Sequence, residues 1–296
     1  MRKIITYLLV ISIVLSFTGC AKDNATMAQK PKEAEYLVKV TGDRPYGVLC
    51  GNKGAIYMVT APASGDGTLW KVDQKGNTKE FAKLEGDFEG NPYTDKSFVS
   101  SGMGIDIKGN IYIALGDRIL KVLKDGKVKT IATGFSRCSD VEVDLQGTLF
   151  VADDKEDAIY KLTPSMEKSM IYKGNLRPSF VLTSLVFDKD YNYLYAREGQ
   201  TILRFDLSID GLQEPEVIAD KMIAFDICMD DNNNIYASSD GSKIRKLDTT
   251  GTISELDTQE LVIVSSLGID IGKTKKDKAF LYIACSNGII KVPIVK

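Results

Sequence analysis

The sequence contains no histidine at all, and this absence excludes more kinds of chemistry than any other feature of its composition. Ser-His-Asp and Cys-His catalysis both need an imidazole to move a proton, and a His-ligated zinc site needs one as a ligand. Cysteine occurs five times, without a CxxC pair or any other metal-ligand spacing. The chain therefore has neither a histidine-based catalytic centre nor a zinc-binding cysteine motif.

An excess of positive charge is also lacking. The chain has 38 Lys and Arg residues against 40 Asp and Glu residues, which gives a formal net charge of −2. A surface that binds phosphates along a nucleic acid needs a concentrated excess of Lys and Arg. We therefore expect no nucleic-acid partner.

A long apolar run occurs once, at the start of the chain. Arg2 and Lys3 precede an apolar segment, Ile4 to Phe17, and small residues follow it. This pattern is typical of a secretory signal peptide and is too short for a membrane-spanning helix. The following Phe-Thr-Gly-Cys resembles the lipobox of bacterial lipoproteins, which makes Cys20 the residue that takes the lipid. An ordinary cleaved signal with an incidental cysteine is the alternative.

These features predict three parts: a signal peptide over residues 1–19, a lipidated Cys20 with a flexible tether over 20–34, and a folded domain over 35–296. The tether is polar, small and without periodicity. Two acyl chains on one residue hold a protein firmly at a membrane surface. We expect the protein in the cell envelope, anchored through lipid on the extracytoplasmic side of a bacterial membrane.

The four remaining cysteines are Cys50, Cys138, Cys228 and Cys285, and they lie far apart in the sequence. Cys50 and Cys228 fall inside apolar strand patterns, which favours a role as small buried side chains. An exported protein also allows a disulfide between any two of them.

A repeat dominates the rest of the chain. Each copy has an Asp or Gly, a polar turn with Gly or Asn, and then an aromatic residue between apolar ones. The copies begin at Gly51 (GNKGAIYM), Asp106 (DIKGNIYIA), Asp144 (DLQGTLFVA), Asp188 (DKDYNYLYA), Asp230 (DDNNNIYA) and Asp270, where an insertion precedes LYIA. Asp caps such a turn, and Gly or Asn accepts the positive φ that a tight hairpin requires.

After the aromatic residue, every copy continues with a polar turn, a strand with a cation at a fixed place, and one further short strand. The cations are Lys71, Lys121, Lys161, Arg204, Lys246 and Lys291. Because they recur in every copy, we interpret them as structural. A repeat of four short strands in about 40 to 50 residues has the length of one propeller blade. The sequence predicts an all-β fold, a six-bladed β-propeller of four-stranded blades.

Closure of the ring gives a separate prediction. The last copy ends after three strands, and the strand 35–40 (EYLVKV) stands alone ahead of the first copy. If this strand is the outer strand of the last blade, the ring closes and no long edge stays exposed.

Alternation along the inner strands indicates which residues face the central channel. At the mouth these are small or acidic residues: Gly47, Gly102, Asp140, Ser184, Asp226 and Ser266. One layer deeper we expect Leu49, Gly104, Glu142, Val186, Cys228 and Gly268.

The repeat resembles two related groups, the NHL-repeat propellers and the six-bladed propellers of the gluconolactonase and senescence-marker-protein superfamily. The resemblance implies the fold. For the hydrolases of the second group it also implies a divalent cation, usually calcium, held by Glu, Asn and Asp. The matching positions here are Tyr46, Ser101, Ser139, Thr183, Phe225 and Ser265. None is a carboxylate or an amide, so no metal is expected at the family positions and no cofactor is predicted.

The remaining candidates lie at the predicted channel mouth. Asp140 and Asp226 replace the small residue, and Glu142 lies one layer deeper, which indicates either a shifted calcium site or a pocket for a cationic group. The alternative is that water solvates these acids, with Arg137 or Arg177 neutralising them. Arg44, Tyr46 and Phe225 are further ligand candidates. The acidic run Asp153–Asp157 reads as a solvated face.

Two functions remain open. The first is a lipid-anchored module without enzymatic activity that binds a protein, a peptide or a small molecule at the channel mouth. The second is a calcium-dependent hydrolase of lactone or ester bonds that resembles the gluconolactonases, with Asp140, Glu142 and Asp226 around the cation. The loss of the family's metal positions favours the first.

Overall fold

The computed structural model describes residues 34–51, 54–61, 66–85, 102–174, 182–222, 224–238, 243–257, 268–273, 279–285 and 287–294. All of them belong to one compact unit, Pro31–Lys296. The predicted signal peptide, Cys20 and most of the tether lie outside the described residues. No helix among the described residues is long and apolar enough to cross a membrane.

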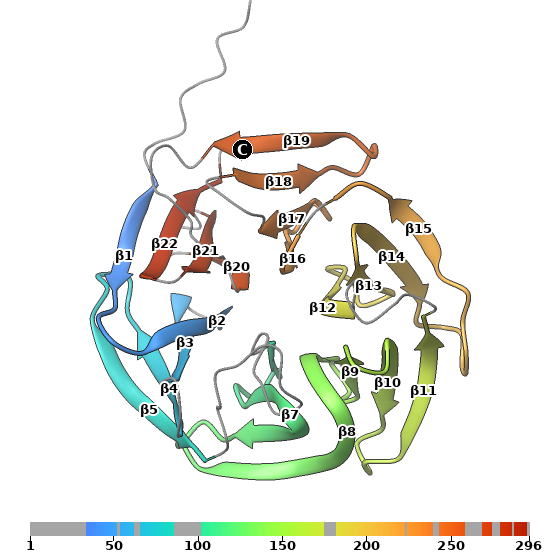
Figure 1. The fold of residues 1–296 in the computed structure, drawn as a ribbon, viewed down its shortest axis with the longest axis horizontal. Coiled ribbons are helices and arrows are strands. Elements are labelled where there is room, and N and C mark those ends of the chain that lie inside the picture. Colours follow the sequence, from blue (N-terminus) through green and yellow to red (C-terminus); the bar gives the residue numbers. More distant parts are fainter. Residues whose placement is uncertain are drawn as a thin grey trace, which may run out of the picture. The chain divides into compact units, whose positions relative to one another are not determined.

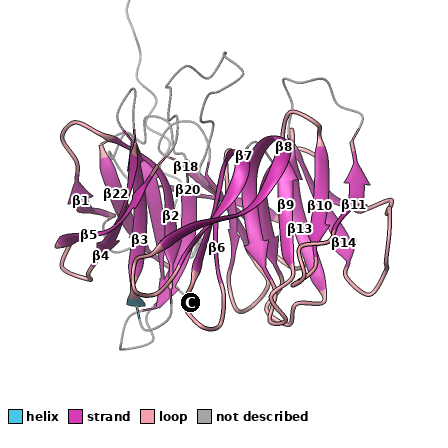
Figure 2. Cartoon of the chain, turned by 90° about the horizontal axis from the view of Figure 1, so that it is seen from below, coloured by secondary structure: helices cyan, strands magenta, loops and turns pink. Residues whose placement is uncertain are grey.

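The described chain is built from 22 β-strands without an α-helix, and the strands form sheets arranged around a central axis (Figures 1 and 2). This all-β propeller confirms the predicted fold class. Four sheets have four strands each. The first has the order β2 (Arg44–Cys50), β3 (Ile56–Ala61), β4 (Gly67–Val72) and β5 (Thr78–Leu84).

Two further sheets follow the same order from the centre outward. One consists of β12 (Leu182–Phe187), β13 (Tyr193–Glu198), β14 (Thr201–Asp206) and β15 (Glu216–Ala219). The next consists of β16 (Ile227–Met229), β17 (Ile235–Ser238), β18 (Lys243–Leu247) and β19 (Ile253–Asp257). All neighbouring strands in them are antiparallel.

The fourth four-stranded sheet joins the two ends of the described chain. Its strands are β20 (Gly268–Lys273), β21 (Ala279–Cys285), β22 (Gly288–Pro293) and β1 (Glu35–Lys39). Strand β1 pairs antiparallel with β22, with Glu35 opposite Lys291. The predicted closure by the strand 35–40 is therefore confirmed, and this strand lies at the outer edge (Figure 1).

The fifth sheet has six strands, so the structure has five hydrogen-bonded sheets, not the predicted six. Its strands are β6 (Met103–Ile105), β7 (Ile111–Val122), β8 (Val128–Val143), β9 (Leu149–Asp153), β10 (Ala158–Leu162) and β11 (Lys168–Lys173). Strand β8 causes the difference because it continues without a break. Its residues Val128–Thr133 pair with β7 and Asp140–Val143 pair with β9, and Cys138 between them pairs with both.

The repeat turns that begin with Asp106, Asp144, Asp188 and Asp230 have the predicted mechanism. In the turn after β6, Asp106 accepts hydrogen bonds from the backbone N–H groups of Lys108 and Asn110, both at 2.9 Å. Gly109 has a φ of 83°, which favours glycine because it has no Cβ. The predicted structural cations also lie in place: most of them stack on an aromatic ring, as Lys121 does on Tyr112 at 4.7 Å.

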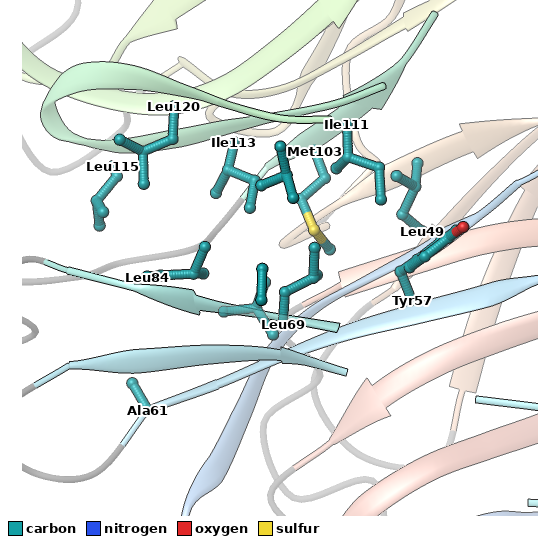
Figure 3. Packing of buried hydrophobic residues seen from close by; sticks show 13 residues of the cluster. Leu49, Tyr57, Ala61, Leu69, Leu84, Met103, Ile111, Ile113, Leu115 and Leu120 are labelled. Carbon is teal, nitrogen blue, oxygen red and sulfur yellow. The ribbon is translucent and has the colours of Figure 1, made fainter. Parts of the chain in front are cut away.

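Apolar side chains fill the spaces between neighbouring sheets. Figure 3 shows one such cluster, in which Leu49, Tyr57 and Leu69 of the first sheet face Met103 and Ile113 of the six-stranded sheet. Large apolar side chains on both faces of a sheet remove much surface from water and hold the ring of sheets together. The inner strands are thereby fixed around the axis.

Candidate functional site

A small cavity of about 50 Å³ lies at the centre of the ring. It is lined by residues of six inner segments: Gly47, Val48, Leu49, Gly102, Met103, Asp140, Glu142, Leu185, Val186, Asp226, Ile227, Cys228, Ile269 and Asp270. A water molecule needs about 10–15 Å³ of such volume, so the cavity has room for a few waters or one ion. An organic substrate does not fit inside it.

The three carboxyl groups predicted at the channel lie together in this cavity. Asp140 and Glu142 come from alternate positions of β8, which places both on the side that faces the axis. Asp226 comes from the segment just before β16. We call these three residues, together with Asp270, the hub carboxyls.

Asp140 links two neighbouring inner strands. One of its oxygens accepts the N–H of Val141 on its own strand at 2.7 Å, and the other accepts the N–H of Leu185 on β12 at 2.6 Å. The side chain is buried. Both carboxyl oxygens of Asp140 are therefore occupied by backbone donors.

Asp226 repeats this arrangement further around the ring. It accepts the N–H of Ile227 at 2.9 Å with one oxygen and the N–H of Ile269 on β20 at 2.9 Å with the other. The hydroxyl of Ser184, on β12, donates to Asp226 and itself accepts the N–H of Ile227 at 3.1 Å. Ser184 is fully buried.

Asp270 is a hub carboxyl that the sequence analysis missed. It accepts the N–H of Ile271 at 2.6 Å and the N–H of Cys50, on β2, at 2.5 Å. The sequence places Gly268 in the layer of Glu142, but Asp270 occupies it. In the structure Asp270 pairs with Tyr282, as Glu142 pairs with Phe150.

The two-residue error comes from the insertion in the last repeat. In the other repeats the channel-facing residues lie four and two positions before the residue that begins the turn, whereas β20 continues through Asp270 to Lys273. Counting back from the aromatic residue does not give the position either, because Glu142 lies eight residues before Phe150 and Asp270 lies twelve before Tyr282. The position follows only from the pairing of β20 with β21.

Burial dominates the acidity of the hub carboxyls. It raises the pKa of Asp270 to about 7, against the hydrogen bonds from Cys50 and Ile271. Burial, followed by the charge of Asp226, raises the pKa of Asp140. Burial also raises the pKa of Asp226, and it raises that of Glu142 well above its usual range, with Asp140 and Asp270 adding to the effect on Glu142.

Glycine allows a different link where no carboxyl is present. The N–H of Gly102 donates directly to the backbone oxygen of Ser139, at 3.1 Å. A Cβ on Gly102 would lie 1.9 Å from a carboxyl oxygen of Asp140 and 2.4 Å from its Cα. The backbone ahead of β6 thus approaches β8 so closely that only glycine fits.

Arg137, one of the two predicted arginine partners, does not pair with the hub carboxyls. Arg137 forms an ion pair with Asp154, not with Asp140, because β8 turns its side chain away from the axis toward the turn after β9. Arg177 lies outside the described residues. Arg197, on β13 opposite Ser184, is the cation whose charge acts on Asp226, and burial lowers its pKa to about 10.

Of the other ligand candidates, Tyr46 and Phe225 do not line the cavity. Arg44 begins β2, and its side chain lies outside the described part of the structure. Tyr46 packs against the apolar cluster between the first two sheets. Phe225, next to Asp226, is 39% exposed. Phe225 is therefore an apolar side chain that is accessible beside the hub.

The prediction of a solvated acidic run at Asp153–Asp157 is wrong. Asp153 is fully buried and accepts the backbone N–H groups of Ser136 and Arg137, and Asp154 is buried against Arg137. Buried backbone N–H groups need acceptors, and these carboxylates supply them. Asp153 and Asp154 thus hold the start of the turn after β9 against β8.

A second pair of acids lies at the end of this run. A Cβ on Gly174 would lie 2.2 Å from a carboxyl oxygen of Asp157 and 2.3 Å from one of Glu198, so both acids surround this glycine. Tyr172 donates its hydroxyl to Glu198 at 2.9 Å. Burial raises the pKa of Glu198, and Asp157 adds to this effect.

The family's calcium arrangement does not fit this site. Tyr46, Ser139, Thr183 and Phe225 occupy four of its positions, and Ser101 and Ser265 lie outside the described residues. Within the part of the chain that the structure describes, no group of three or more Asp, Glu or Cys side chains is arranged to hold a metal ion. Most hub carboxyl oxygens accept backbone N–H groups instead.

The fold and its central cavity define a β-propeller with an acidic hub. No protein-family model and no curated protein matches the sequence. Solved structures do resemble the fold, and their low sequence identities limit the likeness to the fold itself.

Among these structures is a gluconolactonase of Xanthomonas campestris, with a TM-score of 0.67 and 13% identity, covering 92% of this chain and 93% of that one. A streptogramin B lyase has a TM-score of 0.62 and 19% identity, covering 88% and 96%. A catalytically inactive variant of virginiamycin B lyase from Staphylococcus aureus, in which alanine replaces a histidine, was solved with quinupristin. It has a TM-score of 0.57 and 17% identity, covering 89% and 99%.

Proposed function

We propose that this protein is a lipid-anchored propeller of the bacterial cell envelope that binds a protein, a peptide or a small molecule at its channel mouth and has no hydrolase activity. The observation that carries the proposal is the use of the hub carboxyls. Asp140, Asp226 and Asp270 each offer both oxygens to backbone or hydroxyl donors. They serve to join inner strands, which leaves recognition to the surface around the mouth.

Six blades remain part of the proposal. Strand β7 pairs with β6 through Ile111–Ile113 and with β8 through Arg118–Val122. Strand β8 pairs with β7 through Val128–Thr133 and with β9 through Cys138–Val143. If β7 and β8 each supply two strands, the six-stranded sheet is two four-stranded blades. The six inner segments around the cavity support this count.

Hydrolysis of a lactone or an ester, with calcium, is the second candidate. It is favoured by the similarity in fold to the gluconolactonase. Against it stand the volume of the cavity, about 50 Å³, and the residues at the family's metal positions. The lyase reaction is disfavoured for another reason: the inactive lyase variant has lost one histidine, and this chain has none.

Calcium titration by calorimetry, combined with a gluconolactone hydrolysis assay, separates the two candidates. We expect no saturable heat and no turnover above the rate in buffer. Saturable binding with turnover that Asp226→Asn abolishes and Asp125→Asn retains would establish the hydrolase. Asp125 is a matched control because it is an exposed turn aspartate far from the hub.

Binding itself is tested by an NMR screen of short peptides and small molecules. Shifts that cluster at backbone amides around the mouth, such as those of Phe225 and Asp226, are expected. Hits confined to the turns at the opposite end of the strands, around Gly109 and Gly147, would place recognition elsewhere and contradict the proposal. Phe225→Ala removes an exposed ring at the mouth, and we expect this variant to bind the hits more weakly.

The lipid anchor is tested by replacing Cys20. Incorporation of labelled palmitate and sedimentation with membranes are expected for the unaltered chain and should both be lost in Cys20→Ser. A Cys285→Ser variant is the matched control because Cys285 lies within the folded unit. Labelling that survives Cys20→Ser would contradict this part of the proposal.

A further inference from the structure

The hub contains more acid than its surroundings neutralise. Four carboxyl groups, Asp140, Glu142, Asp226 and Asp270, line a cavity of about 50 Å³. The cation whose charge acts on them among the described residues is Arg197, and it acts on Asp226. Like charges at such short range disfavour simultaneous ionisation.

The other titratable groups that face the cluster add no positive charge. Burial raises the pKa of the thiols of Cys50 on β2 and Cys228 on β16. The charge of Asp270 adds to the shift at both thiols. Tyr191, after β12, lies close enough to Glu142 for that charge to raise its pKa. The segment from Gly102 into β6 contributes no titratable group to the cavity.

The hydrogen bonds connect this charge to the closure of the ring. Asp140 joins β8 to β12, Asp226 joins β16 to β20, and Asp270 joins β20 to β2. The hydroxyl of Ser184 donates to Asp226, and it lies close enough to Asp140 to lower the pKa of that carboxyl as well. Repulsion among these carboxylates therefore acts directly on contacts between neighbouring inner strands.

We propose that the four hub carboxyls form a proton-binding site that takes up protons from solvent near neutral pH and thereby tightens the contacts between the inner strands of the propeller. Each proton taken up converts one carboxylate to a carboxylic acid, removes one negative charge and supplies one hydroxyl donor to a neighbouring oxygen. The backbone N–H groups of Leu185, Ile269 and Cys50 keep their acceptors in both states.

The acidities agree with this role. Burial raises the pKa of all four groups, and that of Asp270 to about 7, although backbone donors oppose the shift at each of them. The turn aspartates differ: hydrogen bonds from Asn77 lower the pKa of Asp73. The same protein therefore contains an internal reference for ordinary carboxyl titration.

NMR titration of backbone amides tests the proposal residue by residue. The N–H groups of Leu185, Ile269 and Cys50 report on Asp140, Asp226 and Asp270, and those of Lys75 and Asn77 report on Asp73. We expect the Cys50 amide to inflect near pH 7, with Leu185 and Ile269 also inflecting well above the Asp73 reporters. Glu142→Gln should shift the three hub inflections toward lower pH.

Hub amides that inflect together with Lys75 and Asn77 would overturn the proposal. So would hub amides that respond to calcium or sodium chloride at fixed pH but not to pH, because the cluster would then hold a metal cation in place of protons. Amide exchange gives a second readout: protection of Leu185, Ile269 and Cys50 should fall as the pH rises through their inflections. Unchanged protection, after correction for the intrinsic pH dependence of exchange, would contradict the tightening.

Discussion

The hub and the repeat turns use the same side chain for the same kind of hydrogen bond, with opposite electrostatic results. In the turns, Asp73 and Asp248 lie at the surface and accept two backbone N–H groups each. Hydrogen bonds from the side chains of Asn77 and Thr250, together with these backbone bonds, lower their pKa values. At the hub, Asp140 and Asp270 also accept two N–H groups each, yet burial raises their pKa values. Loss of water outweighs the donors there.

The comparison shows that the number of hydrogen bonds does not by itself fix the state of a carboxyl group. A turn aspartate serves its own hairpin and remains ionised. A hub carboxyl joins separate strands, and its ionised form is unfavourable because burial removes the water that would stabilise the charge. Protonation therefore matters for the hub and not for the turns near neutral pH.

The largest expected effect is that of Asp226→Ala. It removes the acceptor of Ile269 and Ser184 and leaves these two buried donors unsatisfied, whereas Ile227 keeps the hydroxyl of Ser184 as an acceptor. Each buried donor without a partner costs about 1–3 kcal/mol, so we expect a loss of about 3 kcal/mol or more in the free energy of unfolding. Urea unfolding near pH 7 measures it.

Asp226→Asn sharpens the same test because it keeps an acceptor oxygen and the shape of the side chain but carries no charge. We expect it to cost clearly less than Asp226→Ala. If the two variants cost the same, the acceptor at Asp226 does not join the strands as described.

A somewhat smaller effect is expected for Gly102→Ala. The added Cβ would overlap Asp140, including its backbone, so β6 and β8 must move apart. Overpacking of this kind costs about 1–3 kcal/mol. The control is Gly104→Ala, because the added Cβ at this position would lie 2.7 Å from the nearest backbone atom. Less loss at position 102 than at 104 would contradict the close approach.

The smallest effect is expected for the turn aspartates. Asp73→Ala removes a cap from one exposed turn and leaves every link between sheets intact. Its loss of stability should be well below that of either hub variant, and it should be the same near pH 6 and pH 8 because Asp73 is ionised throughout this range. A loss as large as that of Asp226→Ala would remove the distinction between the two regions.

Most of the fold follows from local patterns in the sequence. The turn with Asp and Gly, the aromatic residue and the cation recur with short spacing, and they predict the strands and the closure by β1. The sheet count is different because no local signal marks the continuous path of β8 between β7 and β9. Whether a strand breaks there depends on the packing of its neighbours.

The site is predicted only in part. Alternation along a strand places Asp140, Glu142 and Asp226 at the axis, and the cavity contains all three. The missed Asp270 requires the register of β20 against β21. The pairing of Arg137 with Asp154, and the burial of Asp153, depend on how the turn after β9 folds back on β8. Such long-range contacts leave no local pattern in one sequence.

The most direct measurement of the central claim is the thermal midpoint between about pH 5.5 and 8.5, a range in which ordinary Asp and Glu stay ionised in both the folded and unfolded states. A group whose folded pKa is raised stabilises the fold below its unfolded pKa, and this contribution is lost as the pH rises through the folded value. The hub should therefore make the protein less stable at the alkaline end.

We expect the midpoint to fall by about 3 °C or more across this range. A pKa raised by one unit in the folded state lowers the stability by about 1.4 kcal/mol at high pH, and this loss lowers the midpoint. A Glu198→Gln background removes the contribution of the pair with Asp157, which has the same sign. Adding Asp140→Asn and Glu142→Gln should reduce the remaining slope to the part that Asp226 and Asp270 contribute. A midpoint that stays constant or rises with pH, or a slope that these two replacements leave unchanged, would contradict the account.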